Sequence, residues 1–262
     1  MKTAKRKTPR SPRREVPRHP RRILVIDIGG THVKLRVGTD GEMLRFDSGP
    51  RMGPQQMVRR IRKLTSDWRY DAISMGYPGL VFHGRITAEP HNLGKGWVRY
   101  DFGKAFGVPV RVINDAAMQA IGSYEGGRML FLGLGTGLGA TLILDGVVEP
   151  MEIGHMPYRR GRTFEQYVGQ RGLEKYGPKK WRKLVTEVVD QFRTVLEVDY
   201  VVLGGGNARR IEQLSKKTRR GDNLNAFTGG LKLWHEADSD GLILRGFLGS
   251  QARVPATRRD RG

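Results

Sequence analysis

An apolar strand that ends in a glycine turn occurs twice in this sequence, and the repetition limits what the chain can fold into. Residues 23–28 are aliphatic apart from one aspartate, which is typical of a buried central strand, and Gly29-Gly30-Thr31 follows them. Residues 129–133 form a second such run, which leads through a glycine turn into another strand over 140–144. Two similar halves predict a duplicated α/β fold with a central cleft between them.

The remaining elements alternate in the same way in each half. Further strands are predicted over residues 33–37, 43–47, 71–75, 110–113 and 200–203. Helices are predicted over residues 54–66, 116–124, 163–176, 179–196 and 208–217. We therefore expect an N-terminal domain over 23–124 and a C-terminal domain over 125–250.

The formal charge of +21 is concentrated at the two ends of the sequence. Residues 1–22 carry a net +9 with four prolines and few apolar side chains, so we expect a disordered basic tail. Residues 251–262 carry a net +3 and form a second basic tail, which leaves +9 for the body. A moderately basic body fits an enzyme with a polyanionic substrate, and a solubilising surface explains it equally well.

Two absences narrow the class of protein. No stretch approaches the roughly 20 apolar residues of a membrane-spanning helix, and the basic N-terminus lacks the apolar run of a secretion signal. The sequence contains no cysteine, so disulfides and thiolate metal ligands are excluded. We expect a cytoplasmic protein without membrane contact.

Both glycine turns are suited to phosphate. Glycines let backbone N–H groups approach phosphate oxygens, Thr31 adds a hydroxyl donor, and Asp27 is a candidate Mg²⁺ ligand. A tight hairpin without function is an equally good interpretation of Gly29 and Gly30. The second turn, Gly135-Thr136-Gly137, opens into a strand and not into the helix of a dinucleotide site, which favours a second phosphate-binding hairpin.

Polar residues between and after the two turns are candidates for acid–base chemistry and for sugar binding. Asn114 and Asp115 follow a predicted strand and precede a helix, where a carboxylate could act as general base and where helix capping is the plain alternative. Glu152 and His155 lie in one loop and offer an acceptor and a donor for neighbouring sugar hydroxyls, although a lone histidine is more often structural.

Together, these motifs resemble the ROK sugar kinases and, within that family, the polyphosphate glucokinases. The resemblance runs from about residue 23 to 248 and rests on eight motifs that occur in the same order. In one-letter code these are DIGGT from Asp27, GYPG from Gly76, NL from Asn92 with GW from Gly96, ND from Asn114, GTG from Gly135, EIGH from Glu152, GGGN from Gly204 and NAFTGG from Asn225.

The resemblance implies two similar actin-like, ribonuclease H-like domains and a phosphoryl transfer to a hexose, with glucose as the main expectation. It implies that Asp115 is the catalytic base. Implied sugar-binding residues are Asn114, Glu152, His155, Glu165, Asn92 and Gly79. Implied phosphate- or nucleotide-binding residues are Asp27, Gly29, Gly30, Thr31, Gly135, Thr136, Gly137, Gly205 and Gly206.

The resemblance also implies Mg²⁺, a polyphosphate or ATP donor, and a homodimer. Most ROK kinases carry a cysteine-rich zinc motif after the Gly-His pair, whereas residues 156–164 contain no cysteine, so no zinc site is expected. Polyphosphate glucokinases resemble this chain in that respect, which favours polyphosphate. A basic surface for such a donor could come from Arg159, Arg160, Arg162, Lys179, Lys180, Arg182 and Lys183, for each of which solvated charge is the plain alternative.

Two other interpretations remain open at this stage. The acceptor could be another hexose or an N-acylated amino sugar such as N-acetylmannosamine. Alternatively, the chain could be a non-catalytic sugar-responsive or polyanion-binding protein of the same fold, with basic tails that bind polyanions nonspecifically.

Overall fold

The computed structural model describes residues 22–222 and 224–234. The basic tails predicted at residues 1–22 and 251–262 therefore lie outside the described residues, apart from Arg22. So does the last part of the predicted C-terminal domain, from residue 235 onward.

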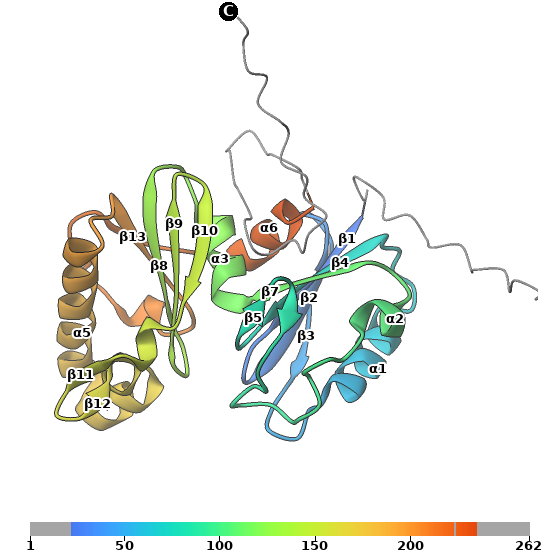
Figure 1. Ribbon diagram of the computed structural model, residues 1–262, viewed down its shortest axis with the longest axis horizontal. Helices are drawn as coiled ribbons and strands as arrows, with labels where there is room; N and C mark the ends of the chain where they lie inside the picture. Colours follow the sequence, from blue (N-terminus) through green and yellow to red (C-terminus); the bar gives the residue numbers. More distant parts are fainter. Residues whose placement is uncertain (1–21, 223, 235–262) are drawn as a thin grey trace, which may run out of the picture.

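Two five-stranded sheets with one topology stand side by side (Figure 1). The first has the order β3-β2-β1-β4-β7, in which β1 pairs antiparallel with β2 and parallel with β4. The second has the order β10-β9-β8-β13-β14, in which β8 pairs antiparallel with β9 and parallel with β13. The same strand order and directions in both sheets confirm the duplicated α/β fold.

The strands of the first sheet are β1 (Ile23–Ile28), β2 (His32–Val37), β3 (Leu44–Asp47), β4 (Ala72–Tyr77) and β7 (Val110–Asn114). Those of the second are β8 (Arg128–Leu134), β9 (Leu138–Leu144), β10 (Val147–Met151), β13 (Tyr200–Gly204) and β14 (Thr218–Arg220). Two small hairpins are β5 (Val81–Phe82) with β6 (Arg85–Ile86), and β11 (Pro157–Arg159) with β12 (Arg162–Thr163).

The helices are α1 (Pro54–Leu64), α2 (Phe102–Phe106), α3 (Asp115–Ser123), α4 (Phe164–Val168), α5 (Gln170–Val195) and α6 (Asn225–Lys232). Short 3₁₀ turns are η1 (Ile153–His155) and η2 (Ala208–Arg210). None of the helices in the described part of the chain is long and apolar enough to cross a membrane.

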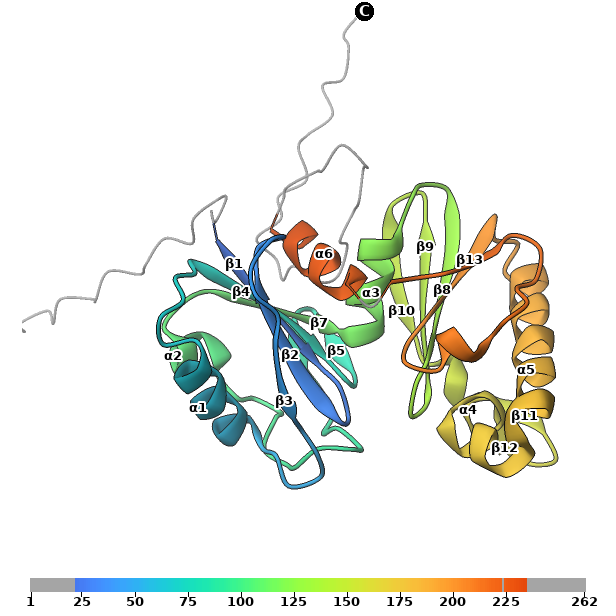
Figure 2. The ribbon, with the colours of Figure 1, turned by 180° about the vertical axis from the view of Figure 1, so that it is seen from behind.

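Alternation along the central strands sorts the apolar side chains into layers. In β1, Leu24 and Ile26 pack toward α1 on the outer face, whereas Ile23 and Val25 pack toward α3 and α6. In β8, Leu130 packs toward α5 on the other outer face. The helices α3 and α6 therefore lie between the sheets and share one core with both, as both views show (Figures 1 and 2).

Glycines allow α3 and α6 to cross closely. A Cβ at Gly122 would lie 1.9 Å from the carbonyl oxygen of Asn225, and one at Gly229 would lie 1.8 Å from that of Met118. Trp234, just after α6, donates through Nε1 to Ser74 Oγ in β4 at 2.9 Å. Because α6 packs on the first sheet, we propose that residues 225–232 belong with the first domain, although they follow the second in sequence.

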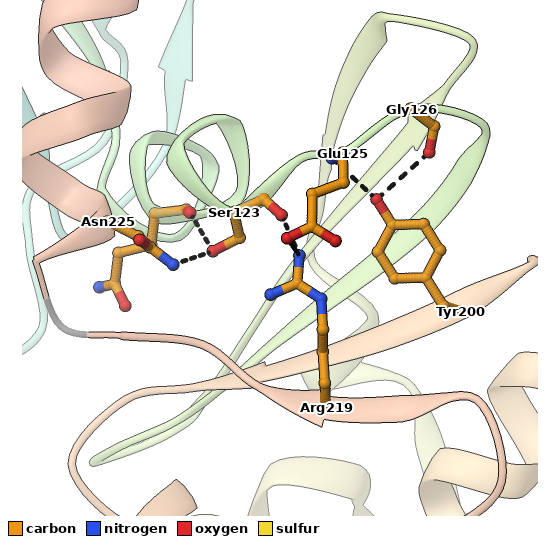
Figure 3. Close-up of polar contacts among 7 residues, drawn as sticks. Ser123, Glu125, Gly126, Tyr200, Arg219 and Asn225 are labelled. Carbon is orange, nitrogen blue, oxygen red and sulfur yellow. Dashed lines mark hydrogen bonds and ion pairs between the residues drawn. The ribbon is translucent and has the colours of Figure 1, made fainter.

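Polar contacts tie the end of α3 to the second sheet (Figure 3). Arg219 of β14 forms an ion pair with Glu125 at 3.1 Å and donates to the carbonyl oxygen of Ser123. Asn225 at the start of α6 donates to Ser123 Oγ at 2.8 Å, and Glu125 donates its backbone N–H to the hydroxyl of Tyr200 in β13 at 3.0 Å. These bonds fix the junction from which both central helices extend.

Two predicted helices differ from the structure. The helix predicted over 208–217 is wrong, because only η2 forms before β14 pairs parallel with β13. In that segment Ile211 is buried but Leu214 is exposed, so no continuous apolar face is available to pack a helix. The helix predicted over 163–176 is divided at Gly169, the cap that ends α4 and begins α5.

We predict that Gly229→Ala severely destabilises the protein, because its Cβ has no space beside the carbonyl of Met118. Overpacking against backbone should cost about 3 kcal/mol or more in urea denaturation. The matched control is Gly103→Ala in α2, where only ordinary contacts surround the new methyl group, and it should change stability by less than about 1 kcal/mol. Equal unfolding midpoints for the two variants would refute the close helix crossing.

Candidate active site

The first glycine turn joins β1 to β2 and lies against the loop that carries Asn92. The N–H of Gly29 donates to the carbonyl of His32 at 2.9 Å, and Ser48 Oγ donates to the carbonyl of Gly29 at 2.7 Å. A Cβ at Gly30 would lie 3.3 Å from the Cβ of Asn92. A predicted phosphate-binding residue and a predicted sugar-binding residue therefore lie next to each other.

Asp27 is a buried carboxylate, 5% exposed, near the end of β1. It faces Lys34 across the β1–β2 register, and Lys34 Nζ lies 3.2 Å from Asp27 Oδ2. This lysine was not among the predicted site residues, although two positions paired across a hairpin are neighbours. Thr31 lies farther out, with Oγ1 3.0 Å from His32 Nδ1, so its hydroxyl already has a partner beside the turn.

Asp115 is the first residue of α3, and Asn114 caps that helix. The side-chain oxygen of Asn114 accepts from the N–H of Ala117 at 3.1 Å, and its amide nitrogen donates to the carbonyl of Gly79 at 3.2 Å. Capping, the plain alternative for this pair, is therefore what Asn114 does, and the same side chain joins it to Gly79. The carboxylate of Asp115 remains available, accepting one bond of 2.8 Å from the N–H of Ala116.

Glycines from both sheets make room for the start of α3. A Cβ at Gly76 in β4 would lie 2.5 Å from the terminal methyl of Met118 in α3 and in ordinary contact, 3.4 Å, with Asp115 Cα, and one at Gly139 in β9 would lie 2.9 Å from the Cβ of Ala116. The first turn of α3 is therefore held between the sheets, with Asp115 at its tip.

Burial raises the pKa of Asp115 to about 7, with a further increase from the negative charge of Asp27 and a smaller one from Glu152. The N–H of Ala116 acts in the opposite direction. These electrostatic effects require three carboxylates from three different elements to lie close together. A carboxylate with a pKa near neutral pH is suited to general base catalysis.

The loop after β10 supplies a second polar group around His155. His155 Nδ1 lies 3.4 Å from Glu152 Oε2, and His155 Nε2 lies 3.6 Å from Glu165 Oε2. Burial raises the pKa of Glu152, the nearby imidazole of His155 acts against this increase, and Glu165 adds to it. The structure thus brings together the three predicted sugar-binding residues of the second half.

The second glycine turn joins β8 to β9 beside that group. The N–H of Gly135 donates to the carbonyl of Gly137 at 3.2 Å, and a Cβ at Gly137 would lie 2.5 Å from Glu165 Oε2. The N–H of Gln170, the first residue of α5, donates to the carbonyl of Gly135 at 3.0 Å and to that of Thr136 at 3.2 Å. This turn is therefore fixed by α5 on one side and lies against Glu165, a predicted sugar-binding residue, on the other.

Gly205 and Gly206 follow β13 next to the second turn. Gly205 has a φ of 79°, and a Cβ there would lie 2.5 Å from the carbonyl oxygen of Leu134. Around Gly206, by contrast, a Cβ would meet no heavy atom within 4 Å. Gly205 thus has a packing reason for its identity, and Gly206 has open space beside it.

His91, which was not among the predicted site residues, lies beside two of them, His155 and Glu152. Its ring centroid lies 6.4 Å from that of His155, edge-on at 82°. Burial is the main cause of the raised pKa of Glu152, and the charge of His91 acts against it, as that of His155 does. The available signal was its position directly before Asn92, because a loop that presents one side chain to a site presents its neighbour close by.

The loop with His91 and Asn92 is held at its base by Glu89. Glu89 Oε2 accepts from the N–H groups of Gly96 and Trp97 at 3.0 and 3.2 Å, and Oε1 accepts from that of Val98 at 3.2 Å. Three backbone donors on one carboxylate fix the loop without using its tip. Asn92 is therefore presented to the first glycine turn from a rigid base.

Known proteins with this arrangement of two sheets share the two-domain actin-like fold. One is a polyphosphate/ATP-glucomannokinase from Arthrobacter sp. strain KM, with a TM-score of 0.71 and 23% identity over 81% of this chain and 98% of that one. Another is a ROK family glucokinase from Streptomyces griseus, solved with glucose and AMPPNP, with a TM-score of 0.62 and 17% identity over 81% of this chain and 98% of that one.

The family follows from the sequence comparison. The model of the ROK family matches residues 23–176, and the chain belongs to that family. It is 25% identical over 217 residues to a polyphosphate glucokinase of Mycobacterium tuberculosis (strain CDC 1551 / Oshkosh). That similarity covers 72% of this chain and 78% of the glucokinase. It is 30% identical over 136 residues to an N-acetylmannosamine kinase of Yersinia pestis (strain Pestoides F), over 47% of each chain.

The raised pKa of Asp115 makes a prediction about stability. In the native state Asp115 keeps its proton up to about pH 7, whereas in the unfolded chain it ionises near pH 3.9. The native state therefore binds more protons between these values, and this contribution to stability is present below pH 4 and lost as pH rises through 7. Relative to wild type, Asp115→Asn should gain roughly 2 kcal/mol between pH 5 and pH 8. The measurement is urea denaturation of both proteins at each pH, and a constant difference would contradict the raised pKa.

Proposed function

We propose that this protein is a sugar kinase that transfers a phosphoryl group from polyphosphate or ATP to a hydroxyl of a hexose, with glucose as its acceptor and Asp115 as general base. The observation that carries the proposal is the position of Asp115. The pKa of Asp115 is near 7, and its carboxylate lies close to Asp27 from the first half and Glu152 from the second. The chain that carries it belongs to the ROK family.

The sugar would be bound between the two groups of side chains. Glu152 and Glu165 offer acceptors, and His155, held between them, offers a donor or an acceptor according to its tautomer. Asn92, Asn114 and Gly79 would contribute from the first half. We add His91 to this set, since its ring lies beside that of His155. Sugar hydroxyls both donate and accept, so this mixture is suited to them.

The donor would be bound by the two glycine turns. Gly29, Gly30 and Thr31 would approach it from the first half, and Gly135, Thr136 and Gly137 from the second. Gly205 and Gly206 would border the rest of the donor, where Gly206 leaves open space. Backbone N–H groups in such turns bind anions without competition from side chains.

A magnesium ion fits the carboxylate available at Asp27. Within residues 22–222 and 224–234, no group of three or more His, Asp or Glu side chains could hold a metal ion by itself. Mg²⁺ in kinases commonly takes one or two carboxylates and completes its shell with phosphate oxygens and water, so a single buried aspartate suffices. When bound, it would neutralise charge on the donor phosphates. Lys34 would supply a further positive charge from the protein itself.

In the transfer, the acceptor hydroxyl of the sugar gives its proton to Asp115 as its oxygen forms a bond to the terminal phosphorus. The bond between that phosphorus and the bridging oxygen breaks, and the shortened polyphosphate, or ADP, leaves with the electron pair. Base catalysis of this kind is worth roughly 10²- to 10⁴-fold in rate. Asp115 can act in this way because burial beside Asp27 leaves it ready to accept a proton near neutral pH.

Support for glucose and polyphosphate comes from the similar polyphosphate glucokinases and the polyphosphate/ATP-glucomannokinase. An N-acylated amino sugar is the second candidate acceptor, because part of the chain is similar to an N-acetylmannosamine kinase. A panel of sugars assayed with ATP and with polyphosphate separates these choices. Absence of turnover with every pair would favour the non-catalytic alternative.

We predict that Asp115→Asn lowers kcat by at least about 100-fold while the affinity for glucose stays within a factor of three. The amide keeps the size of the side chain but cannot accept the proton. Steady-state kinetics and calorimetric binding of glucose measure the two quantities. A variant with wild-type kcat would show that Asp115 is not the base.

We predict that His91→Asn raises the KM for glucose about fivefold with little change in kcat, because it removes a sugar contact that is equal in ground and transition states. The matched control is His83→Asn, at an exposed histidine with a φ of 49° that asparagine tolerates. If both substitutions leave the KM unchanged, His91 does not contact the sugar.

A further inference from the structure

An aromatic stack extends from the candidate site along α4 and the start of α5. Tyr167 lies two residues after Glu165, and its ring stacks on that of Tyr176 with centroids 5.4 Å apart and planes at 16°. Tyr158 meets Tyr167 edge-on at 5.2 Å. The outer member of this stack, Tyr176, is half-buried and faces the surface.

Three cations gather around Tyr176. Lys175 Nζ lies 5.4 Å and Lys180 Nζ 5.2 Å from the centre of its ring. Burial alone would raise the pKa of Tyr176. Hydrogen bonding to Tyr167 and the charges of Lys175 and Arg162 nevertheless lower it below its usual value. These interactions place Arg162 beside the hydroxyl of Tyr176. We call Arg162, Lys175, Tyr176 and Lys180 the Tyr176 surface.

The cations of the Tyr176 surface differ from neighbouring basic residues in their partners. Arg159 forms an ion pair with Glu187, and Arg182 forms one with Glu212. In the part of the chain that the structure describes, Arg162, Lys175 and Lys180 have no carboxylate partner within ion-pair distance. The positive charge of this surface is therefore not neutralised by the protein.

Lys175 and Tyr176 lie on the first part of α5, the same part that fixes the second glycine turn, whereas Lys180 follows a break in α5 at Gly177 and Arg162 belongs to β12. Gln170 donates its N–H to the carbonyls of Gly135 and Thr136. At about 1.5 Å per residue, Tyr176 follows Gln170 by roughly 9 Å along the axis. An anion that extends from the turn along the first part of α5 would come to Lys175 and Tyr176, and Lys180 lies 5.2 Å from the centre of the same ring.

We propose that the Tyr176 surface holds the distal phosphates of an inorganic polyphosphate chain whose terminal phosphate is engaged at the Gly135–Gly137 turn. The inference rests on the proposed function and extends it, because it assigns a place to the part of the donor that does not react. A flexible polyanion needs separated cations and not a closed pocket, and each cation that neutralises a phosphate also releases counterions. Because ATP carries only three phosphates, we expect it to gain little from this surface.

The test compares two double variants of the full chain that each lose two positive charges. In Lys175→Ala/Lys180→Ala the KM for long-chain polyphosphate should rise about tenfold. Its dependence on salt concentration should weaken by about one to two units of log–log slope. The KM values for ATP and glucose should stay within twofold. The control is Arg62→Ala/Lys63→Ala, at exposed positions in the last turn of α1, which should behave as wild type.

An unchanged KM for long-chain polyphosphate in Lys175→Ala/Lys180→Ala, or an equal increase in the control, overturns the proposal. If wild-type protein uses ATP but not polyphosphate, the proposed donor is wrong and the surface is tested by inhibition. Polyphosphate should then inhibit the ATP reaction about tenfold less well in Lys175→Ala/Lys180→Ala than in the control, and equal inhibition would refute the Tyr176 surface.

Discussion

The site depends on how closely the first turn of α3 approaches both sheets. Gly76 in β4 and Gly139 in β9 leave no side chain in the way, so the backbone at Asp115 comes against one sheet and Ala116 against the other. A Cβ at Gly139 would lie 2.9 Å from that of Ala116 and would push α3 toward the first half, whereas a Cβ at Gly76 would meet the flexible end of the Met118 side chain. This packing is what brings Asp115 near Asp27 and Glu152, and the proximity of those carboxylates, together with burial, keeps its pKa near 7.

The two halves use the same sheet for different purposes. In each, the first antiparallel hairpin carries a glycine turn, and the helices that follow build the rest of the site. The first half adds the loop with Asn92, fixed by the carboxylate of Glu89, and the second adds η1 and α4, which carry His155 and Glu165. With α3 and α6 packed between them, the halves bring Asp27 from the first and Glu152 from the second near Asp115.

Much of the fold could be predicted because strand alternation and glycine turns are local signals. The run Ile23–Ile28 and its counterpart in β8 need no knowledge of the tertiary structure to be recognised. The failures arise where tertiary pairing decides the outcome. Residues 208–217 were predicted as a helix, but they form only the turn η2 before β14 pairs with β13. The sequence predicted that Asn114 lies between a strand and a helix, as it does. Its hydrogen bond to Gly79 could not be predicted, because that residue is distant in sequence. Lys34 and His91 escaped notice because their partners lie across a hairpin and in the other half.

The most direct measurement is a ¹³C NMR titration of the Asp115 carboxyl in the wild-type protein and in Asp27→Asn. The arrangement predicts a pKa near 7 in wild type that falls when the charge of Asp27 is removed. A wild-type value near 4 that does not move in the variant would mean that the two carboxylates do not share a site, and the proposed base would lose its physical basis.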